Sequence, residues 1–133
     1  MRIRQAAELL GVSDDTVRRW IDNGVLSASK DAAGRKVIAG NVLAEFWRSN
    51  ARPLPTNPLG TGSSARNRFV GLVTNVISDK VMTQVEIQCG PHTVVSLMST
   101  EAARELKLKP GSLAVAVVKA TTVIVETPKA VGD

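Results

Sequence analysis

Two groups of residues in the first fifty positions have the types and spacing to bind nucleic acid. Thr16, Arg18 and Arg19 lie on a predicted helix, on the side turned away from its apolar residues, and so face solvent or DNA. Arginine can fork onto guanine edges, whereas lysine mainly neutralises phosphate. The second group lies at or beside the tip of a predicted basic hairpin and consists of Lys30, Arg35 and Lys36. These six residues are the candidate DNA-contact set.

Three predicted helices and a hairpin must position these side chains. The first helix covers residues 5–10, the second runs from the N-cap Ser13 to about Asn23, and Asn41 caps the third. Two short strands within residues 26–38 form the hairpin. Apolar residues at helical spacing give each helix an inward face. These faces consist of Ala6, Leu9 and Leu10, then Val17, Trp20 and Ile21, then Val42, Leu43, Phe46 and Trp47.

Four short motifs follow one another within residues 1 to about 49. They are Ala6-Ala7-Glu8-Leu9-Leu10-Gly11-Val12-Ser13, Thr16-Val17-Arg18-Arg19-Trp20, Gly24-Val25-Leu26 and Gly34-Arg35-Lys36. Together they resemble the winged helix-turn-helix of the MerR and excisionase families. The resemblance implies that the second helix enters the major groove, where Thr16, Arg18 and Arg19 read or clamp DNA. It also implies that Lys30, Arg35 and Lys36 hold phosphates.

Two observations qualify this interpretation. The chain departs from MerR regulators because no long dimerisation helix follows residue 50, so any dimer must be made by the second half. The alternative is that Arg18 and Arg19 form a solvated helix face, and that this half is a protein-interaction module.

The composition changes near residue 51, so we expect two small domains in the 133 residues rather than one. The predicted division is a DNA-binding domain at 1–50, a Pro/Gly-rich linker at 51–63, an oxyanion-binding domain at 64–128 and a tail at 129–133. The formal net charge of +5 permits nucleic-acid binding without establishing it. Because domains of this size bury little surface, we expect a homo-oligomer.

The lack of a recognisable targeting segment and the single cysteine lead us to expect a cytoplasmic protein. No apolar run approaches the ~18 residues that span a bilayer, and no signal-peptide core follows Met1. The one cysteine, Cys89, excludes an intrachain disulfide and has no partner for catalysis or metal binding, so we expect a packed thiol. His92 follows a probable turn, where a single histidine is usually solvated.

In the second half of the chain, apolar and polar residues alternate as they do in half-buried β-strands. Val81, Thr83, Val85 and Ile87 alternate with more polar residues, and the strands are expected at 72–77, 81–88, 93–98, 113–119 and 122–126. A short helix capped by Ser99 is expected at about 100–106. The predicted fold class is therefore α+β, with a winged helix-turn-helix joined by the linker to a small barrel similar to an OB-fold.

Three motifs mark the β-rich half. They are Ser64-Ala65-Arg66-Asn67-Arg68-Phe69-Val70-Gly71, Leu106-Lys107-Leu108-Lys109-Pro110-Gly111 and Val117-Val118-Lys119-Ala120-Thr121. In combination they resemble the Mop or TOBE domain of molbindins over residues 64 to about 127. The resemblance implies molybdate or tungstate bound in pockets at subunit interfaces. The residues carried over as its ligands are Ser64, Arg66, Ser99, Lys119, Ala120 and Thr121.

The chemistry of this set suits a tetrahedral dianion, which offers only acceptors and needs converging hydroxyls, backbone N–H groups and cations. The family often has a second hydroxyl residue one turn into the short helix, where this chain has Ala102. Losing one such donor costs about 1–3 kcal/mol unless a backbone N–H or a water replaces it. Molybdenum is expected only as the oxyanion, without a metal-ligand cluster.

The leading hypothesis is a molybdate- or tungstate-responsive transcriptional regulator that binds double-stranded DNA. The alternative is an intracellular storage or buffering protein, in which the helix-turn-helix serves assembly or targeting. A third interpretation is an enzyme of molybdenum cofactor metabolism, since the family has been described as pterin-binding. The chain shows no nucleophile with a paired base and no phosphate-cradling glycine loop, so we expect a protein that is not an enzyme.

Overall fold

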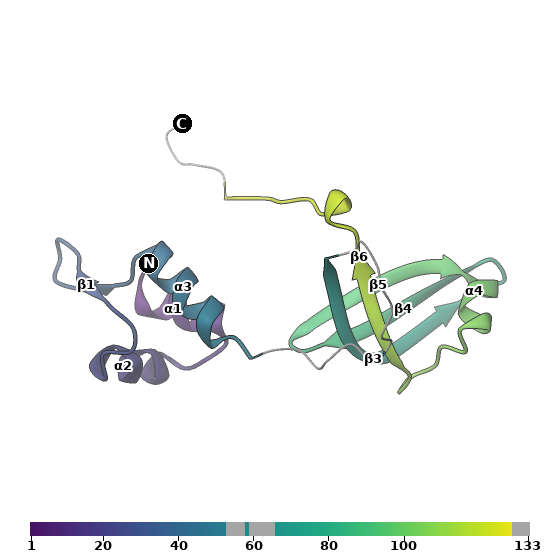
Figure 1. Ribbon diagram of the computed structural model, residues 1–133, viewed down its shortest axis with the longest axis horizontal. Coiled ribbons are helices and arrows are strands. Elements are labelled where there is room, and N and C mark those ends of the chain that lie inside the picture. Colours follow the sequence, from purple (N-terminus) through teal and green to yellow (C-terminus); the bar gives the residue numbers. More distant parts are fainter. Residues whose placement is uncertain (53–57, 59–65, 129–133) are drawn as a thin grey trace. The chain divides into compact units, whose positions relative to one another are not determined.

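The chain divides into two compact units, Met1–Pro53 and Leu54–Asp133, in a mixed arrangement of helix and sheet (Figure 1). The computed structural model describes residues 1–52, 58 and 66–128. Most of the predicted linker, the whole predicted tail and Ser64 lie outside the described residues.

The first unit contains three helices and a small hairpin. Its elements are α1 (Ile3–Leu10), α2 (Asp14–Asp22), the antiparallel pair β1 (Ser29–Lys30) and β2 (Lys36–Val37), and α3 (Gly40–Asn50). Gly11 ends α1 in the left-handed conformation, at φ 70°. The Ser13 hydroxyl accepts the Thr16 backbone N–H at 3.1 Å and so caps α2 as predicted.

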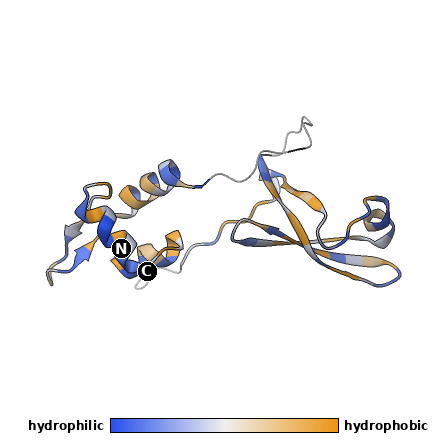
Figure 2. Cartoon of the chain, turned by 90° about the horizontal axis from the view of Figure 1, so that it is seen from below, coloured by the Kyte–Doolittle hydropathy of each residue, from blue (hydrophilic) through white to orange (hydrophobic). Residues whose placement is uncertain are grey.

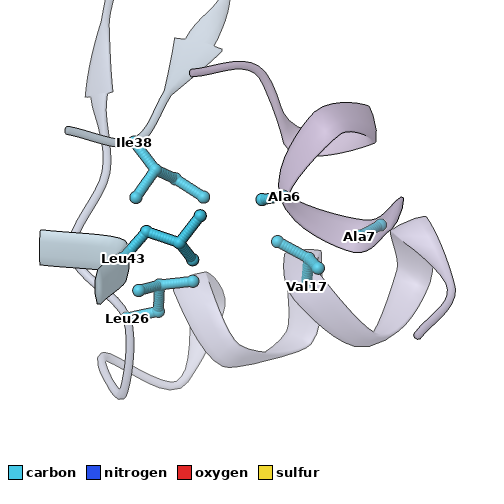
Figure 3. Close-up of a cluster of buried hydrophobic side chains, with 6 residues drawn as sticks. All are labelled: Ala6, Ala7, Val17, Leu26, Ile38 and Leu43. Carbon is cyan, nitrogen blue, oxygen red and sulfur yellow. The ribbon is translucent and has the colours of Figure 1, made fainter. Parts of the chain in front are cut away.

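The core of the first unit joins all three helices and the hairpin. Figure 3 shows its buried side chains, which are Ala6, Ala7, Val17, Leu26, Ile38 and Leu43. The small residues of α1 permit a close approach to α2, and the rings of Trp20 and Phe46 pack at the rim with centroids 5.0 Å apart. Leu26 and Ile38, on either side of the hairpin, pack in the same core as Val17 of α2.

Three details predicted for these helices are wrong. Leu9 is exposed, because the buried face of α1 is centred between Ala6 and Ala7. Trp47 is 41% exposed, because Leu43 and Phe46 define the inward face of α3. Asn41 does not cap α3, because the helix already begins at Gly40 and has no side-chain hydrogen bond at its N-cap.

The second unit is a curled antiparallel sheet with one short helix. Its elements are β3 (Asn67–Ser78), β4 (Met82–Cys89), β5 (His92–Ser99), α4 (Thr100–Glu105), β6 (Leu113–Val118) and the 3₁₀ turn η1 (Ala120–Thr122). The strand order is β5-β4-β3-β6. The first half of β3 pairs with β6 and the second half with β4, with a register shift between Val73 and Asn75. That shift lets the long strand bend the sheet.

The inner face of this sheet carries the second core. Thr83, Val85, Ile87 and Cys89 are buried at alternate positions of β4. The alternation predicted the first three, but Val81 is 70% exposed, because β4 begins only at Met82. Figure 2 shows hydrophobic stretches in orange along the strands of this sheet. Where polar groups are buried they are paired, since the Thr83 and Thr100 hydroxyls lie 2.9 Å apart. Ser99 caps α4 as predicted, its hydroxyl accepting the Ala102 N–H.

The fifth predicted strand, at 122–126, is wrong. Residues 120–122 form η1, and residues 123–128 have no regular structure. Ile124 and Val125 are 85% and 80% exposed. The apolar alternation of this segment requires a sheet edge to pair with, and within the described residues the segment pairs with none.

We expect Gly71→Ala to destabilise the second unit by about 1–3 kcal/mol. A Cβ at this position would collide with the Gln88 carbonyl oxygen and would lie 2.8 Å from the Cys89 Sγ, both part of β4. Denaturant unfolding of the full chain measures the change. Gly40→Ala is the matched control, because a Cβ there meets nothing within 4 Å. Equal stability of the two variants would show that the sheet relaxes freely around residue 71.

Candidate nucleic-acid and oxyanion sites

Helix α2 presents two arginines and one threonine from the candidate DNA-contact set. Arg18 and Arg19 are exposed, and Arg18 pairs with Asp15 at 3.3 Å. Thr16 is only half-buried, but its hydroxyl lies 2.9 Å from that of Ser13. The ion pair is exposed and weak, so the Arg18 guanidinium can exchange its carboxylate for a phosphate.

The hairpin is organised by Asp31. One carboxylate oxygen accepts the backbone N–H groups of Ala33 and Arg35, both at 2.9 Å, and the other accepts the Arg35 Nε–H at 3.1 Å. The backbone hydrogen bond from Arg35 is the main cause that lowers the pKa of Asp31. Lys36 lies 3.6 Å from Asp22 and so joins the hairpin to α2. Lys30 is exposed at the end of β1.

The structure brings three of the six candidates, Arg18, Arg35 and Lys36, to one groove. The groove has a volume of about 790 Å³. Arg2 and Arg4 line it as well, and our sequence analysis missed them. The available signal was the pair of arginines on either side of Ile3, immediately before the first apolar face. Thr16, Arg19 and Lys30 are not among its lining residues.

The predicted oxyanion residues near β6 lie at one end of the sheet. Asn67 pairs with Val118, so Arg66, which precedes Asn67, and Lys119, which follows Val118, lie just beyond the last paired position at that end. Ala120 and Thr121 lie in η1, immediately after Lys119, and all four residues are exposed. The antiparallel register therefore places the cations of Arg66 and Lys119 and the hydroxyl of Thr121 at the same end of the β3–β6 pair.

Ser99 lies at the opposite end of the sheet. It pairs with Met82 where β5 ends, near the far end of β3. Figure 1 shows α4, which begins after Ser99, away from the turn that follows β6. A strand of twelve residues extends about 35 Å. One chain therefore does not bring Ser99 together with Arg66 and Lys119.

Cys89 and His92 take the places expected of them. Cys89 is fully buried, and burial raises the pKa of its thiol. Its Sγ lies 3.5 Å from the Phe69 carbonyl oxygen, so it is a packed thiol. His92 is exposed at the start of β5.

Across residues 1–52 and 66–128, no three His, Cys, Asp or Glu side chains gather in a way that could hold a metal ion. No helix in the described part of the chain has the length and apolar character needed to cross a membrane.

Two family models match the chain in sequence. One, described as a helix-turn-helix domain, matches residues 1–51, and the other, described as a TOBE domain, matches residues 63–125. The first part of the chain is thus similar to helix-turn-helix domains and the second part to TOBE domains.

Known proteins match about half of the chain. The molybdenum transport protein ModE of Herbaspirillum seropedicae is 39% identical over 66 residues, which are 49% of this chain and 24% of ModE. The cytoplasmic molybdate-binding protein ModG, solved with molybdate bound, is 36% identical with a TM-score of 0.51, covering 57% of this chain and 55% of ModG. MopII from Clostridium pasteurianum is 31% identical with a TM-score of 0.47, covering 50% of this chain and all of MopII.

We expect the hairpin to loosen in acid. Because the pKa of Asp31 is lowered, its ionised form stabilises the fold above the ordinary aspartate value, and this stabilisation is lost as the pH falls through the folded value. Amide hydrogen exchange at Ala33 and Arg35, followed as the solution is acidified, measures the loss. Asp31→Asn should remove the acid-dependent change in the protection factors of these two amides, which already correct for the intrinsic pH dependence of exchange. A variant that keeps the same acid transition would assign it to another carboxylate.

Proposed function

We propose that this chain is a molybdate- or tungstate-responsive DNA-binding transcriptional regulator. The observation that carries the proposal is the presence, in one chain, of a helix-turn-helix domain and a TOBE domain similar to a protein solved with molybdate bound. The chain covers 24% of the length of its ModE relative, so the proposal concerns these two domains. Binding alone is proposed.

The first unit is proposed to act as a winged helix-turn-helix of the MerR or excisionase type. Helix α2 would enter the major groove with Arg18 and Arg19 at its exposed surface. The hairpin would be the wing, with Arg35 and Lys36 on phosphates. Two features support this: Asp31 orders the hairpin tip, and the Lys36–Asp22 pair connects the hairpin to α2. Thr16 and Lys30 complete the proposed contact set.

The oxyanion site is proposed to form between two copies. Arg66, Lys119, Ala120 and Thr121 would come from one chain, together with Ser64, and Ser99 from another. The argument is geometric, because these groups occupy opposite ends of the sheet within a chain. A small dianion must touch several donors at about 3 Å, and a second copy is the simplest way to supply them.

A homo-oligomer is proposed to close the barrel. In the described sheet, β5 and β6 each have one unpaired edge, and an apolar groove of about 410 Å³ lies between them. Its lining includes Val94, Met98, Leu108 and Ala116. The exposed residues 123–125 could pair with such an edge in a second copy and bury their side chains there. Strand exchange would then complete the OB-like barrel.

The two sites are proposed to be coupled through this assembly. An oxyanion bound between subunits would stabilise one packing of the barrels and so favour one spacing of the DNA-binding units. The coupling must be reciprocal, because an anion that strengthens DNA binding is itself bound more tightly when DNA is present.

Isothermal titration with molybdate, alongside sulfate and phosphate, tests the function first. We expect selective molybdate binding, and a change in affinity for a duplex selected from genomic fragments when molybdate is added. The double substitution Arg18→Ala with Arg19→Ala should abolish duplex binding without changing molybdate uptake. Molybdate uptake with no duplex selected would favour the storage protein, and a duplex affinity independent of molybdate would rule out a sensor.

Mixing two inactive variants tests the shared site. Ser99→Ala and Lys119→Ala should each bind molybdate weakly. Co-refolding equal amounts should restore about a quarter of the sites, because chance then combines an intact Ser99 with an intact Lys119 from a different chain. Adding Ile124→Asp to both variants should prevent assembly and recovery. No recovery from the first mixture would rule out a site that combines Ser99 of one chain with Lys119 of another.

A further inference from the structure

The groove between α1, α2 and the hairpin contains two arginines, Arg2 and Arg4, that are not among the six predicted contact residues. Five cationic side chains and two carboxylates line it, so cations outnumber carboxylates among the lining residues. The cations are Arg2, Arg4, Arg18, Arg35 and Lys36. We propose that this groove seats the DNA sugar-phosphate backbone, with Arg2 as a principal phosphate ligand. The inference rests on the proposed DNA-binding function and extends its surface to α1.

The backbone around Arg2 is held firmly by the hairpin. Arg2 forms an antiparallel bridge with Val37, and the Ile38 backbone N–H donates to the Met1 carbonyl oxygen at 2.6 Å. The first residues therefore extend the β1–β2 pair as a further extended segment. Because Arg2 also occupies the N-cap of α1, its position relative to Lys36 is set by two elements at once. A phosphate ligand placed in this way loses little backbone freedom on binding.

Ion pairing distinguishes Arg2 from the other four cations. Arg4 pairs with Glu8 at 3.7 Å, Arg18 with Asp15, Arg35 with Asp31, and Lys36 with Asp22. Arg2 has no carboxylate within 4.0 Å among the residues that the structure describes. Its guanidinium can therefore bind a phosphate without first giving up a carboxylate, whereas the other four must exchange a partner.

The lining also identifies which part of a nucleic acid would lie in the groove. It includes no aromatic side chain, and Ile3 is its one apolar member among the described residues. An unpaired base would need an aromatic ring to stack on, whereas a phosphate backbone needs cations and hydrogen-bond donors. Arg18 lines the groove and also belongs to the proposed recognition helix, so a duplex contacting α2 can continue into the groove.

Salt-dependent binding to a short duplex of arbitrary sequence tests the proposal. In the full chain, Arg2→Gln should weaken binding several-fold at low salt. It should also reduce the slope of log affinity against log salt by about 1, the value for one phosphate contact. Arg48→Gln is the matched control, because Arg48 lies on α3, is exposed and does not line the groove. Its slope should equal that of the unmodified chain.

The outcomes separate this inference from the proposed function. If Arg18→Ala with Arg19→Ala loses duplex binding while Arg2→Gln keeps the full affinity and slope, the DNA-binding function stands and the role of Arg2 is wrong. If the unmodified chain does not bind the duplex even at low salt, both fail. Thermal unfolding of Arg2→Gln should match the unmodified chain, because the bridge to Val37 uses only backbone atoms. A lower midpoint would instead assign Arg2 a structural role.

Discussion

The division of β3 between two partners is the constraint on which the second unit depends. One half of this strand pairs with β6 and the other half with β4, so the two neighbours are offset along its length. The register shift after Val73 and the absence of a side chain at Gly71 allow the sheet to curl at this point. The same offset leaves β5 and β6 apart, with an apolar groove between their free edges.

The first unit solves a different problem, which is to hold many cations close together on a small body. Its core contains only six buried residues, and charged side chains surround it. Carboxylates from α1, α2 and the hairpin are interspersed among the arginines and reduce their mutual repulsion. Since each of these ion pairs is exposed and weak, the carboxylates order the cations and can still be exchanged for another anion.

Local signals in the sequence predicted most of the elements. Ser13, Gly11 and Ser99 mark helix ends through capping geometry that depends on adjacent residues, and the alternation in β4 reports a buried face directly. The strand prediction for residues 122–126 was wrong for a physical reason. A strand requires a partner edge, and an alternating sequence does not show where that edge lies. The position of Arg2 in the groove could not be predicted for the same reason, because it depends on the backbone bridge to Val37, thirty-five positions later.

The separation of Arg66 and Lys119 from Ser99 bears on how such a protein would behave in a cell. A small ion cannot touch both ends of one sheet, so a pocket that uses both ends exists only after two chains have met. Under the proposed function, the response would then depend on the abundance of the protein as well as on that of the anion. A cell that holds few copies would need more of the anion for the same response, so the level of expression would shift the threshold of the response.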